Sequence, residues 1–305
     1  MAIKTILVTG GSGLVGSALN KISREYQYNF VFLDSKMCNL LNYRETSNFF
    51  KMLEPDYVIH LAAVVGGLYK NQNEPIKMMN DNLIINTNVL KCAYKYKVKK
   101  LIACLSTCIF PEKEMLNETM LHDGPPHESN EGYAYAKRML EIQCKIYSKQ
   151  GCNFSCVIPT NIYGSYDNFN LMDSHVIPGL IHQCYIAKQI NEPFVVKGSG
   201  RPLRQFIYNI DLAKIIMELI ILDYRENIII APTQEYSIKE VAEIIAWNFD
   251  KLSIIYDKSF SDGQYRKTVD NSKLINLFNF EFTSLNHGIS DTIDWFLRNY
   301  NTLRK

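Results

Sequence analysis

The feature that most constrains this sequence is a glycine-rich turn close to its first residues. Residues 5–8 are apolar and predict a buried strand, and residues 9–16 then read T-G-G-S-G-L-V-G, with glycines at 10, 13 and 16. Apolar residues at helical spacing follow over 15–26. In such a strand–turn–helix unit the glycines allow a tight turn, a close approach of the backbone to a pyrophosphate, and close packing of helix on sheet. The turn therefore predicts a dinucleotide site with the phosphates at the helix N-terminus.

Strands and helices are expected to alternate through the first half of the chain. The expected strands are residues 5–8, 30–33, 57–61, 100–105 and 155–158, and the expected helices are 15–26, 43–52, 80–96 and 135–150. The strands are short and show little polar alternation, which is typical of a parallel sheet buried on both faces. This pattern predicts an α/β fold with a Rossmann-type, doubly wound parallel sheet.

The regular pattern ends near Gly164. Residues 165–173 are polar and aromatic without periodicity, and helix-like, strand-like and loop segments mix after them. We therefore expect a dinucleotide-binding Rossmann domain over 1–164 and a smaller C-terminal α/β lobe, mainly for substrate, over 165–305. The chain is expected to return to the first domain at about 206–222.

Composition narrows the class of partner. The formal net charge is +2, which gives no electrostatic reason to expect nucleic acid or an anionic membrane as a partner. No apolar run reaches the roughly 20 residues needed to span a bilayer. The eight cysteines contain no C-x-x-C pair, so no metal site is expected. Without a secretion signal, the expectation is a cytoplasmic protein with reduced thiols.

A Y-x-x-x-K pattern at Tyr133 and Lys137 opens one of the expected helices. Residues four apart share a helix face, so the ammonium can lie near the phenol and favour its ionised form. Tyr133 would then exchange a proton with a carbonyl or alcohol near neutral pH. Ser106 follows an expected strand, where a second hydrogen-bond donor to the same oxygen would lie. An ordinary amphipathic helix start is the alternative, and the upstream glycine turn argues against it.

Two neighbouring charges give conflicting indications about the cofactor. Asp34 ends the second expected strand, where an acid commonly binds the ribose 2′-hydroxyl of NAD. Lys36 lies two residues further on and suits the 2′-phosphate of NADP. A pair of solvated loop charges is an equally good interpretation.

Further segments carry a resemblance to a known family. They are H-L-A-A at 60–63 with V-G-G at 65–67, L-S-T-C-I-F-P at 105–111, I-P-T-N-I-Y-G at 158–164, D-N-F at 167–169, S-H-V-I-P at 174–178 and G-S-G-R-P-L-R-Q-F at 198–206. With the glycine turn and the Ser–Tyr–Lys set, the chain resembles the extended short-chain dehydrogenases/reductases and, among them, the GDP-L-fucose synthase family. The resemblance covers nearly the whole chain, and S-T-C-I-F-P and S-H-V-I-P are its specific segments.

This resemblance implies an enzyme that acts on GDP-4-keto-6-deoxy-D-mannose. Its members invert C3 and C5 beside the ketone and then reduce C4 to give GDP-L-fucose. Cys108 and His175 match the family's acid/base pair, and their ordinary pKa values suit proton exchange near neutral pH. Tyr133 would protonate the new alkoxide and Ser106 would polarise the ketone. From the residues alone, a buried apolar cysteine and a packed histidine are the plainer interpretations.

The resemblance also implies binding residues. Those for the cofactor are Gly10, Ser12, Gly13, Leu14, Val15, Gly16, Asp34, Lys36, Leu61, Ala62, Ala63, Lys137, Pro159, Asn161 and Ile162. Those for the GDP-sugar are Asn161, His175, Val176, Lys197, Arg204 and Lys267. The family implies NADPH, although Asp34 leaves NADH open. The chain departs from the family at Gln183, where bacterial members carry arginine, and at Lys197, where tryptophan is frequent.

Two rival functions stay open from the sequence. One is another sugar-nucleotide epimerase or reductase on the same fold, such as a 4-epimerase that retains NAD. The other is an inactive, dinucleotide-sensing binding protein, against which the complete set of Ser106, Cys108, Tyr133, Lys137 and His175 argues. The resemblance also implies a homodimer, formed through the two long helices expected at 80–96 and 135–150.

Overall fold

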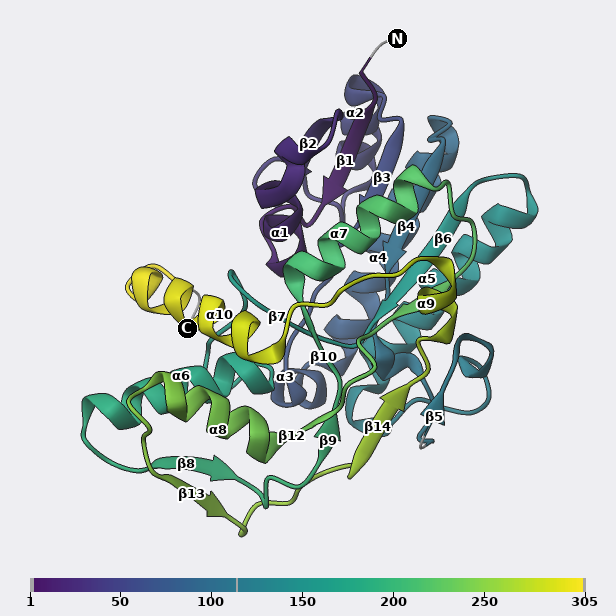
Figure 1. Ribbon diagram of the computed structural model, residues 1–305. Coiled ribbons are helices and arrows are strands. Elements are labelled where there is room, and N and C mark those ends of the chain that lie inside the picture. Colours follow the sequence, from purple (N-terminus) through teal and green to yellow (C-terminus); the bar gives the residue numbers. More distant parts are fainter. Residues whose placement is uncertain (1–2, 114, 304–305) are drawn as a thin grey trace.

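A parallel sheet is the centre of the computed structural model, which describes residues 3–113 and 115–303 (Figure 1). In space its six strands run β2 (Asn29–Leu33), β1 (Thr5–Thr9), β3 (Tyr57–His60), β4 (Lys100–Cys104), β6 (Phe154–Pro159) and β11 (Ile228–Ile230). Every neighbouring pair is parallel, and Leu7 of β1 lies level with Val31 and Val58 on either side. The order reverses at β1, which confirms the Rossmann-type, doubly wound sheet.

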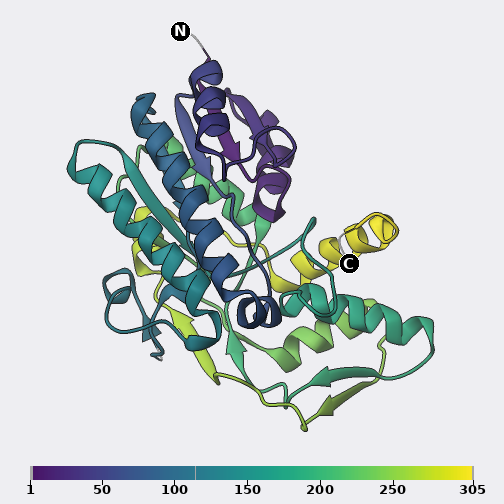
Figure 2. The ribbon, with the colours of Figure 1, turned by 180° about the vertical axis from the view of Figure 1, so that it is seen from behind.

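Helices cover both faces of this sheet, which explains why its strands lack alternation. Helices α1 (Leu14–Ile22) and α7 (Asn209–Ile221) pack on one face, where their apolar side chains surround Ile6 and Val8. On the other face lie α2 (Tyr43–Leu53), α4 (Pro75–Lys95) and α5 (Glu131–Lys149), seen from behind in Figure 2. Strands β3 and β4 are buried along their whole length. Short apolar strands of this kind are therefore two-sided core elements.

Local chemistry sets the helix boundaries. The Asn42 side chain accepts hydrogen bonds from the backbone N–H groups of Arg44 and Glu45, and so caps α2. Helix α4 begins at Pro75, five residues before the expected start at residue 80. Proline suits the first position of a helix, because its missing N–H would have no partner there.

The chain returns to the sheet over a longer stretch than 206–222. Strand β10 (Phe206–Tyr208) pairs with β7 (Asn161–Tyr163) and leads into α7. Beyond α7, β11 adds to the edge of the sheet beside β6. Lys100 fixes this return, because its buried Nζ donates to the carbonyl oxygens of Leu219 and Tyr224, each at 2.7 Å.

A second lobe with a core of its own lies below the central sheet in Figure 1. Its elements are α6 (Val176–Gln189), β8 (Phe194–Lys197), β9 (Leu203–Arg204), β12 (Tyr236–Ser237), α8 (Ile238–Asn248), β13 (Ile254–Asp257), β14 (Arg266–Val269) and α10 (Leu285–Asn299). Its core is built on apolar side chains such as Ile181, Ile245 and Phe296. Strand β14 lies between β9 and β5 (Met115–Leu116) of the first lobe, so a small sheet joins the two lobes.

In the part of the chain that the structure describes, no helix combines the length and the apolar character needed to cross a membrane.

Candidate active site

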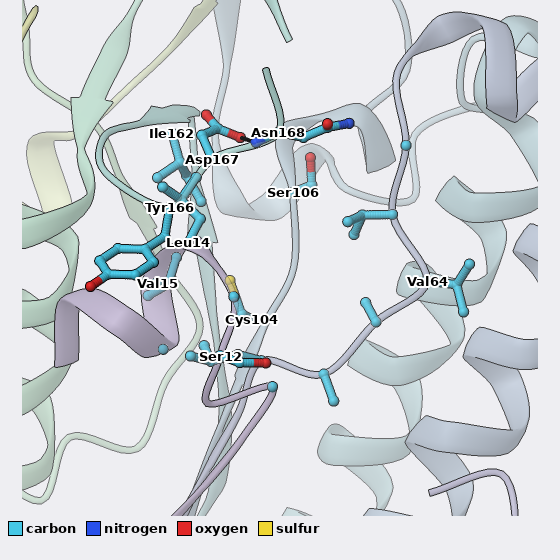
Figure 3. A pocket seen from close by; sticks show the side chains of 18 of the residues that line it. Ser12, Leu14, Val15, Val64, Cys104, Ser106, Ile162, Tyr166, Asp167 and Asn168 are labelled. Carbon is cyan, nitrogen blue, oxygen red and sulfur yellow. Dashed lines mark hydrogen bonds between the residues drawn. The ribbon is translucent and has the colours of Figure 1, made fainter. Parts of the chain in front are cut away.

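A cleft of about 900 Å³ lies at the carboxyl ends of the central strands, where a doubly wound sheet binds its ligands (Figure 3). Most of the residues expected at the site line it. These are Gly10, Ser12, Gly13, Leu14, Val15, Gly16, Asp34, Leu61, Ala62, Ala63, Ser106, Cys108, Tyr133, Lys137, Pro159, Asn161, Ile162 and His175. Five expected residues are not part of this lining, namely Lys36, Val176, Lys197, Arg204 and Lys267.

The glycine turn is shaped for a dinucleotide. Gly10 has φ +71°, and a Cβ added there would lie 2.8 Å from the backbone nitrogen of Ala62. Helix α1 is capped by Gly13, which has no side chain to occupy the N–H groups of the first turn. Leu14 and Val15 of that turn line the cleft. The helix N-terminus therefore fits the pyrophosphate of NAD(P).

The Asp34 carboxylate accepts hydrogen bonds from the backbone of its own loop. Asp34 directly follows β2, and its Oδ1 accepts hydrogen bonds from the backbone nitrogens of Lys36 at 2.9 Å and Met37 at 3.1 Å. The exposed Lys36 side chain makes no hydrogen bond or ion pair with any residue described in the structure. This cation is therefore available to a phosphate at the edge of the cleft.

Ser106 and Cys108 lie beyond the end of β4, in and just before the 3₁₀ turn Thr107–Ile109. The Ser106 hydroxyl oxygen accepts from the backbone nitrogen of Cys108 at 3.4 Å and caps this turn. Burial raises the pKa of the Cys108 thiol, while Lys267, the Ser106 hydroxyl and Lys137 act in the opposite direction. Nearby cations therefore offset part of the desolvation of a thiolate at this position.

Tyr133 and Lys137 lie on one face of the first turns of α5. The buried Lys137 Nζ donates to the carbonyl oxygen of Cys104 at 2.7 Å and lies 5.8 Å from the centre of the Tyr133 ring. Burial raises the pKa of Tyr133 well above its usual range, and the thiols of Cys108 and Cys104 add to this. The lowering expected from Lys137 is not found, because desolvation of the phenolate dominates. The raised pKa favours the phenol form of Tyr133 over the phenolate.

His175 and Asn161 approach the cleft from the second lobe and from β7. His175 is the N-cap residue of α6, and its exposed ring makes no hydrogen bond with any described residue. Asn161 donates from Nδ2 to the carbonyl oxygen of Gln205 at 2.8 Å, which joins β7 to the segment before β10.

Arg204 and Lys267 form a pair of cations behind Cys108. They lie level with each other on β9 and β14. The Arg204 guanidinium donates to the carbonyl oxygens of Leu203 and Gln264, each at 2.7 Å. Burial lowers the pKa of both side chains, and Arg204 lowers that of Lys267 further. The charge of Lys267 opposes the rise in the pKa of the Cys108 thiol, so the two side chains interact electrostatically.

The remaining two expected substrate residues lie apart from this group. Lys197 is exposed at the end of β8, with its Nζ 4.8 Å from the centre of the Phe260 ring. Val176 is exposed at the start of α6, next to His175.

Several cleft residues are not among the expected site residues, although D-N-F at 167–169 is one of the segments that carry the resemblance. Tyr166, Asp167 and Asn168 line the cleft between β7 and α6, and Figure 3 shows them across from Val64. The ring of Tyr166 contacts Trp295 of α10, with 4.7 Å between ring centres. Trp295 belongs to the last helix, so only tertiary packing brings it to this site. Among the described residues, no three His, Cys, Asp or Glu side chains gather as metal ligands.

The cleft lies at the strand ends, fits a dinucleotide, and is lined by a serine, a tyrosine and a lysine. These features define an NAD(P)-dependent oxidoreductase site. Residues 6–228 match the profile of the NAD dependent epimerase/dehydratase family, and the chain belongs to this family.

Within that family, the chain is similar to GDP-L-fucose synthases. It is 45% identical to the GDP-L-fucose synthase of Dictyostelium discoideum, over 99% of this chain and 98% of that one. It is 42% identical to a probable GDP-L-fucose synthase of Drosophila melanogaster, over 99% and 100% of the two chains. A crystal structure of a GDP-L-fucose synthetase from Naegleria fowleri bound to NADP superposes with a TM-score of 0.94 at 43% identity, covering 99% of this chain and 95% of the other.

Proposed function

We propose that this protein is an NADPH-dependent GDP-L-fucose synthase, which converts GDP-4-keto-6-deoxy-D-mannose to GDP-L-fucose. The observation that carries the proposal is the presence of Cys108 and His175 in the same cleft as Ser106, Tyr133 and Lys137. A reductase needs only the last three residues. An epimerase that also reduces needs an additional acid/base pair at the sugar ring, and a thiol and an imidazole supply it.

Inversion at C3 and C5 depends on the neighbouring ketone, which makes both C–H bonds acidic. One member of the Cys108–His175 pair removes a proton from the ring carbon, and the other returns a proton to the opposite face. Burial raises the pKa of the Cys108 thiol, and Lys267 and Lys137 oppose that rise and so assist the thiolate that would remove a proton. His175 is suited to proton return because its ring is exposed to the cleft and has no competing hydrogen bond among the described residues.

Reduction at C4 needs an acid beside the carbonyl oxygen. The reduced nicotinamide, when bound, supplies a hydride to C4. Tyr133 delivers the proton to the oxygen, and burial keeps this phenol protonated at neutral pH. Ser106 donates a second hydrogen bond to the same oxygen, as an oxyanion-hole group does. The Lys137 ammonium is held near the Tyr133 ring by its hydrogen bond to the carbonyl oxygen of Cys104.

NADPH is the cofactor that the cleft fits better. Asp34 engages its own loop through Oδ1, while Lys36 beside it has no partner among the described residues. A 2′-phosphate gains from Lys36 and is held at the edge of the cleft, where water screens its repulsion from Asp34. The Naegleria fowleri relative, which is bound to NADP, supports this choice.

Arg204 and Lys267 are proposed to hold the diphosphate of the GDP-sugar. They are neighbouring cations on two paired strands. Burial lowers the pKa of both side chains, so an anionic partner would stabilise their charged forms. Asn161 and Val176 would border the sugar on either side of His175. Lys197 would contact the nucleotide only at its outer end, since it lies outside the cleft lining.

Apolar side chains on α4 and α5 support a homodimer. The exposed ones are Ile76, Met79, Ile84, Tyr94, Tyr135, Met139 and Ile146. Ile76 is 75% exposed and Ile146 is 56% exposed, on two adjacent helices of the same sheet face. Light scattering should give twice the chain mass of 35.2 kDa. Ile146→Glu should lower that mass toward one chain, while Ile190→Glu, on the exposed end of α6, should not.

Cytoplasmic location is proposed from the thiols. All eight cysteines are free, and several are buried in the sheet core. The folded protein therefore contains these cysteines as reduced thiols. A reducing compartment suits such a chain.

The test of the function is an assay of purified protein with GDP-4-keto-6-deoxy-D-mannose, run in parallel with NADPH and NADH. Stoichiometric consumption of NADPH, faster than that of NADH, with GDP-L-fucose as product, is the expected result. No consumption together with retained NAD would support a 4-epimerase instead. Cofactor binding without turnover of any keto sugar would support a dinucleotide-sensing protein.

A further inference from the structure

Asp173, in the segment that carries His175, is hydrogen-bonded to the first lobe. The backbone nitrogen of Gly67 donates to Asp173 Oδ1 at 2.6 Å and to the Asp173 carbonyl oxygen at 3.1 Å. Gly67 caps α3 (Leu68–Asn73), so its N–H is fixed at the start of a helix. A short hydrogen bond to a carboxylate is a strong one. This contact, the Gly67–Asp173 clasp, joins loops of the two lobes.

The two loops are packed closely around the clasp. A Cβ added to Gly67 would lie 3.0 Å from the carbonyl oxygen of Asp173 and 3.2 Å from that of Ser174. Asn168 supports Asp173 by donating to its carbonyl oxygen at 3.1 Å, and Asn71 donates to the carbonyl oxygen of Gly67 at 2.9 Å. Gly67 and Asp173 are therefore each fixed by a further hydrogen bond within their own segment. The clasp can then keep the distance between the two loops constant.

Each loop continues directly into the cleft. Residues 61–66 line it ahead of Gly67, and His175 lines it just after Asp173. The His175 ring has no hydrogen bond of its own among the described residues, and its carbonyl oxygen accepts from Gly179 in the first turn of α6. The position of the ring is therefore set by its backbone. Among the described residues, the nearest hydrogen bond between that backbone and the other lobe is the one at Asp173.

We propose that Asp173 is a positioning residue for ring inversion: through the Gly67–Asp173 clasp it holds His175 at the face of the sugar opposite Cys108. The inference rests on the proposed function, since it concerns the acid/base pair of that reaction. It assigns Asp173 no contact with substrate or cofactor. Loss of its carboxylate should therefore affect proton exchange at C3 and C5 more than hydride transfer at C4.

The test compares two readouts in the purified enzyme. Proton exchange is measured as deuterium uptake from heavy water at C3 and C5 of GDP-4-keto-6-deoxy-D-mannose, with NADP⁺ bound so that reduction does not follow. Hydride transfer is measured as the initial rate of NADPH formation from GDP-L-fucose and NADP⁺, which needs Tyr133 and Ser106 but no inversion. Both are measured at saturating substrate, so that kcat is separated from KM.

Asp173→Ala removes the acceptor, and Asp173→Asn keeps an oxygen at the same place. Because a misplacement of about 1 Å can cost a catalytic group up to about 100-fold, we expect roughly a ten-fold or larger loss of deuterium uptake in Asp173→Ala. Hydride transfer in that variant should stay within about two-fold of wild type, and Asp173→Asn should restore most of the uptake. Asn170→Ala is the matched control, because Asn170 Oδ1 accepts only within the same loop, from Met172.

Gly67→Ala provides an independent variant. Gly67 has φ −68°, which alanine adopts without strain, so the added Cβ acts by pressing on the backbone of Asp173 and Ser174. It should reproduce the selective loss of deuterium uptake with unchanged thermal stability. Equal losses in both readouts, or uptake at the wild-type rate in Asp173→Ala, would overturn the inference. Absence of uptake in the wild-type enzyme would instead contradict the proposed function.

Discussion

The Lys137 ammonium lies 5.8 Å from the centre of the Tyr133 ring, and its nearest hydrogen bond goes to the carbonyl oxygen of Cys104. The two side chains are neighbours, as their spacing on α5 predicts, yet the pKa of Tyr133 is raised. Burial in the cleft outweighs the cation. The raised pKa keeps Tyr133 in its phenol form, which is the form that the proposed protonation of the alkoxide requires.

The first prediction concerns the separation of the two reactions. Tyr133→Phe removes the proton donor and leaves Cys108 and His175 in place. NADPH oxidation should fall by at least about 100-fold, in the range usual for loss of general acid catalysis. Deuterium uptake at C3 and C5 should persist. A variant that loses both activities equally would show that Tyr133 serves both steps.

The second prediction concerns the inversion pair. Cys108→Ser and His175→Ala should each suppress deuterium uptake by about 100-fold or more, because each removes an acid/base group. Binding of NADPH, followed by fluorescence, should be unchanged in both variants. Normal uptake in Cys108→Ser would exclude the thiol from the inversion.

Local spacing made the cofactor half of the site predictable. The glycine turn and the Y-x-x-x-K pattern each lie within a few residues, so their geometry follows from one turn or one helix. The resemblance then supplied Cys108 and His175, whose presence in one cleft is a property of the tertiary fold.

What the sequence could not predict depends on long-range packing. The three-residue strand Ile228–Ile230 is too short to be told from any other apolar run, although it extends the central sheet. Trp295 reaches the cleft from the last helix. The raised pKa of Tyr133 follows from burial, which spacing along a helix does not reveal.

The third prediction follows from the cation behind Cys108. Burial raises the pKa of this thiol and Lys267 opposes that rise, so Lys267→Met should raise the pKa further. The rising limb of the pH profile for deuterium uptake should then move to higher pH at saturating substrate. Alkylation of Cys108 in the free enzyme, followed by peptide mass spectrometry, should shift in the same direction. Lys197→Met, outside the cleft, is the control, and an unshifted profile in Lys267→Met would refute the coupling.

The fourth prediction concerns acid stability. His60 is buried in β3, between the Thr9 hydroxyl at 2.8 Å and the Asn86 amide oxygen at 3.0 Å. Burial, with a contribution from Lys137, lowers the pKa of His60 from 6.5 to about 3. Between these two values the unfolded chain binds the extra proton, so stability falls as the pH falls from 6.5 toward 3.

This loss should approach about 1.4 kcal/mol per pH unit from His60. His60→Gln should start less stable at neutral pH but lose less free energy of unfolding between about pH 6 and pH 5 than wild type, measured by urea denaturation. An equal loss in both proteins would mean that other groups set the acid sensitivity.

Incorporation of solvent hydrogen into the reduced product tests the central claim most directly. The enzyme is given GDP-4-keto-6-deoxy-D-mannose and NADPH in heavy water, and the product is analysed by NMR and mass spectrometry. We expect GDP-L-fucose with deuterium at both C3 and C5 and the hydride of NADPH at C4. A reduced product that carries no deuterium at C3 or C5 would show a reductase without ring inversion, and would contradict the roles given to Cys108 and His175.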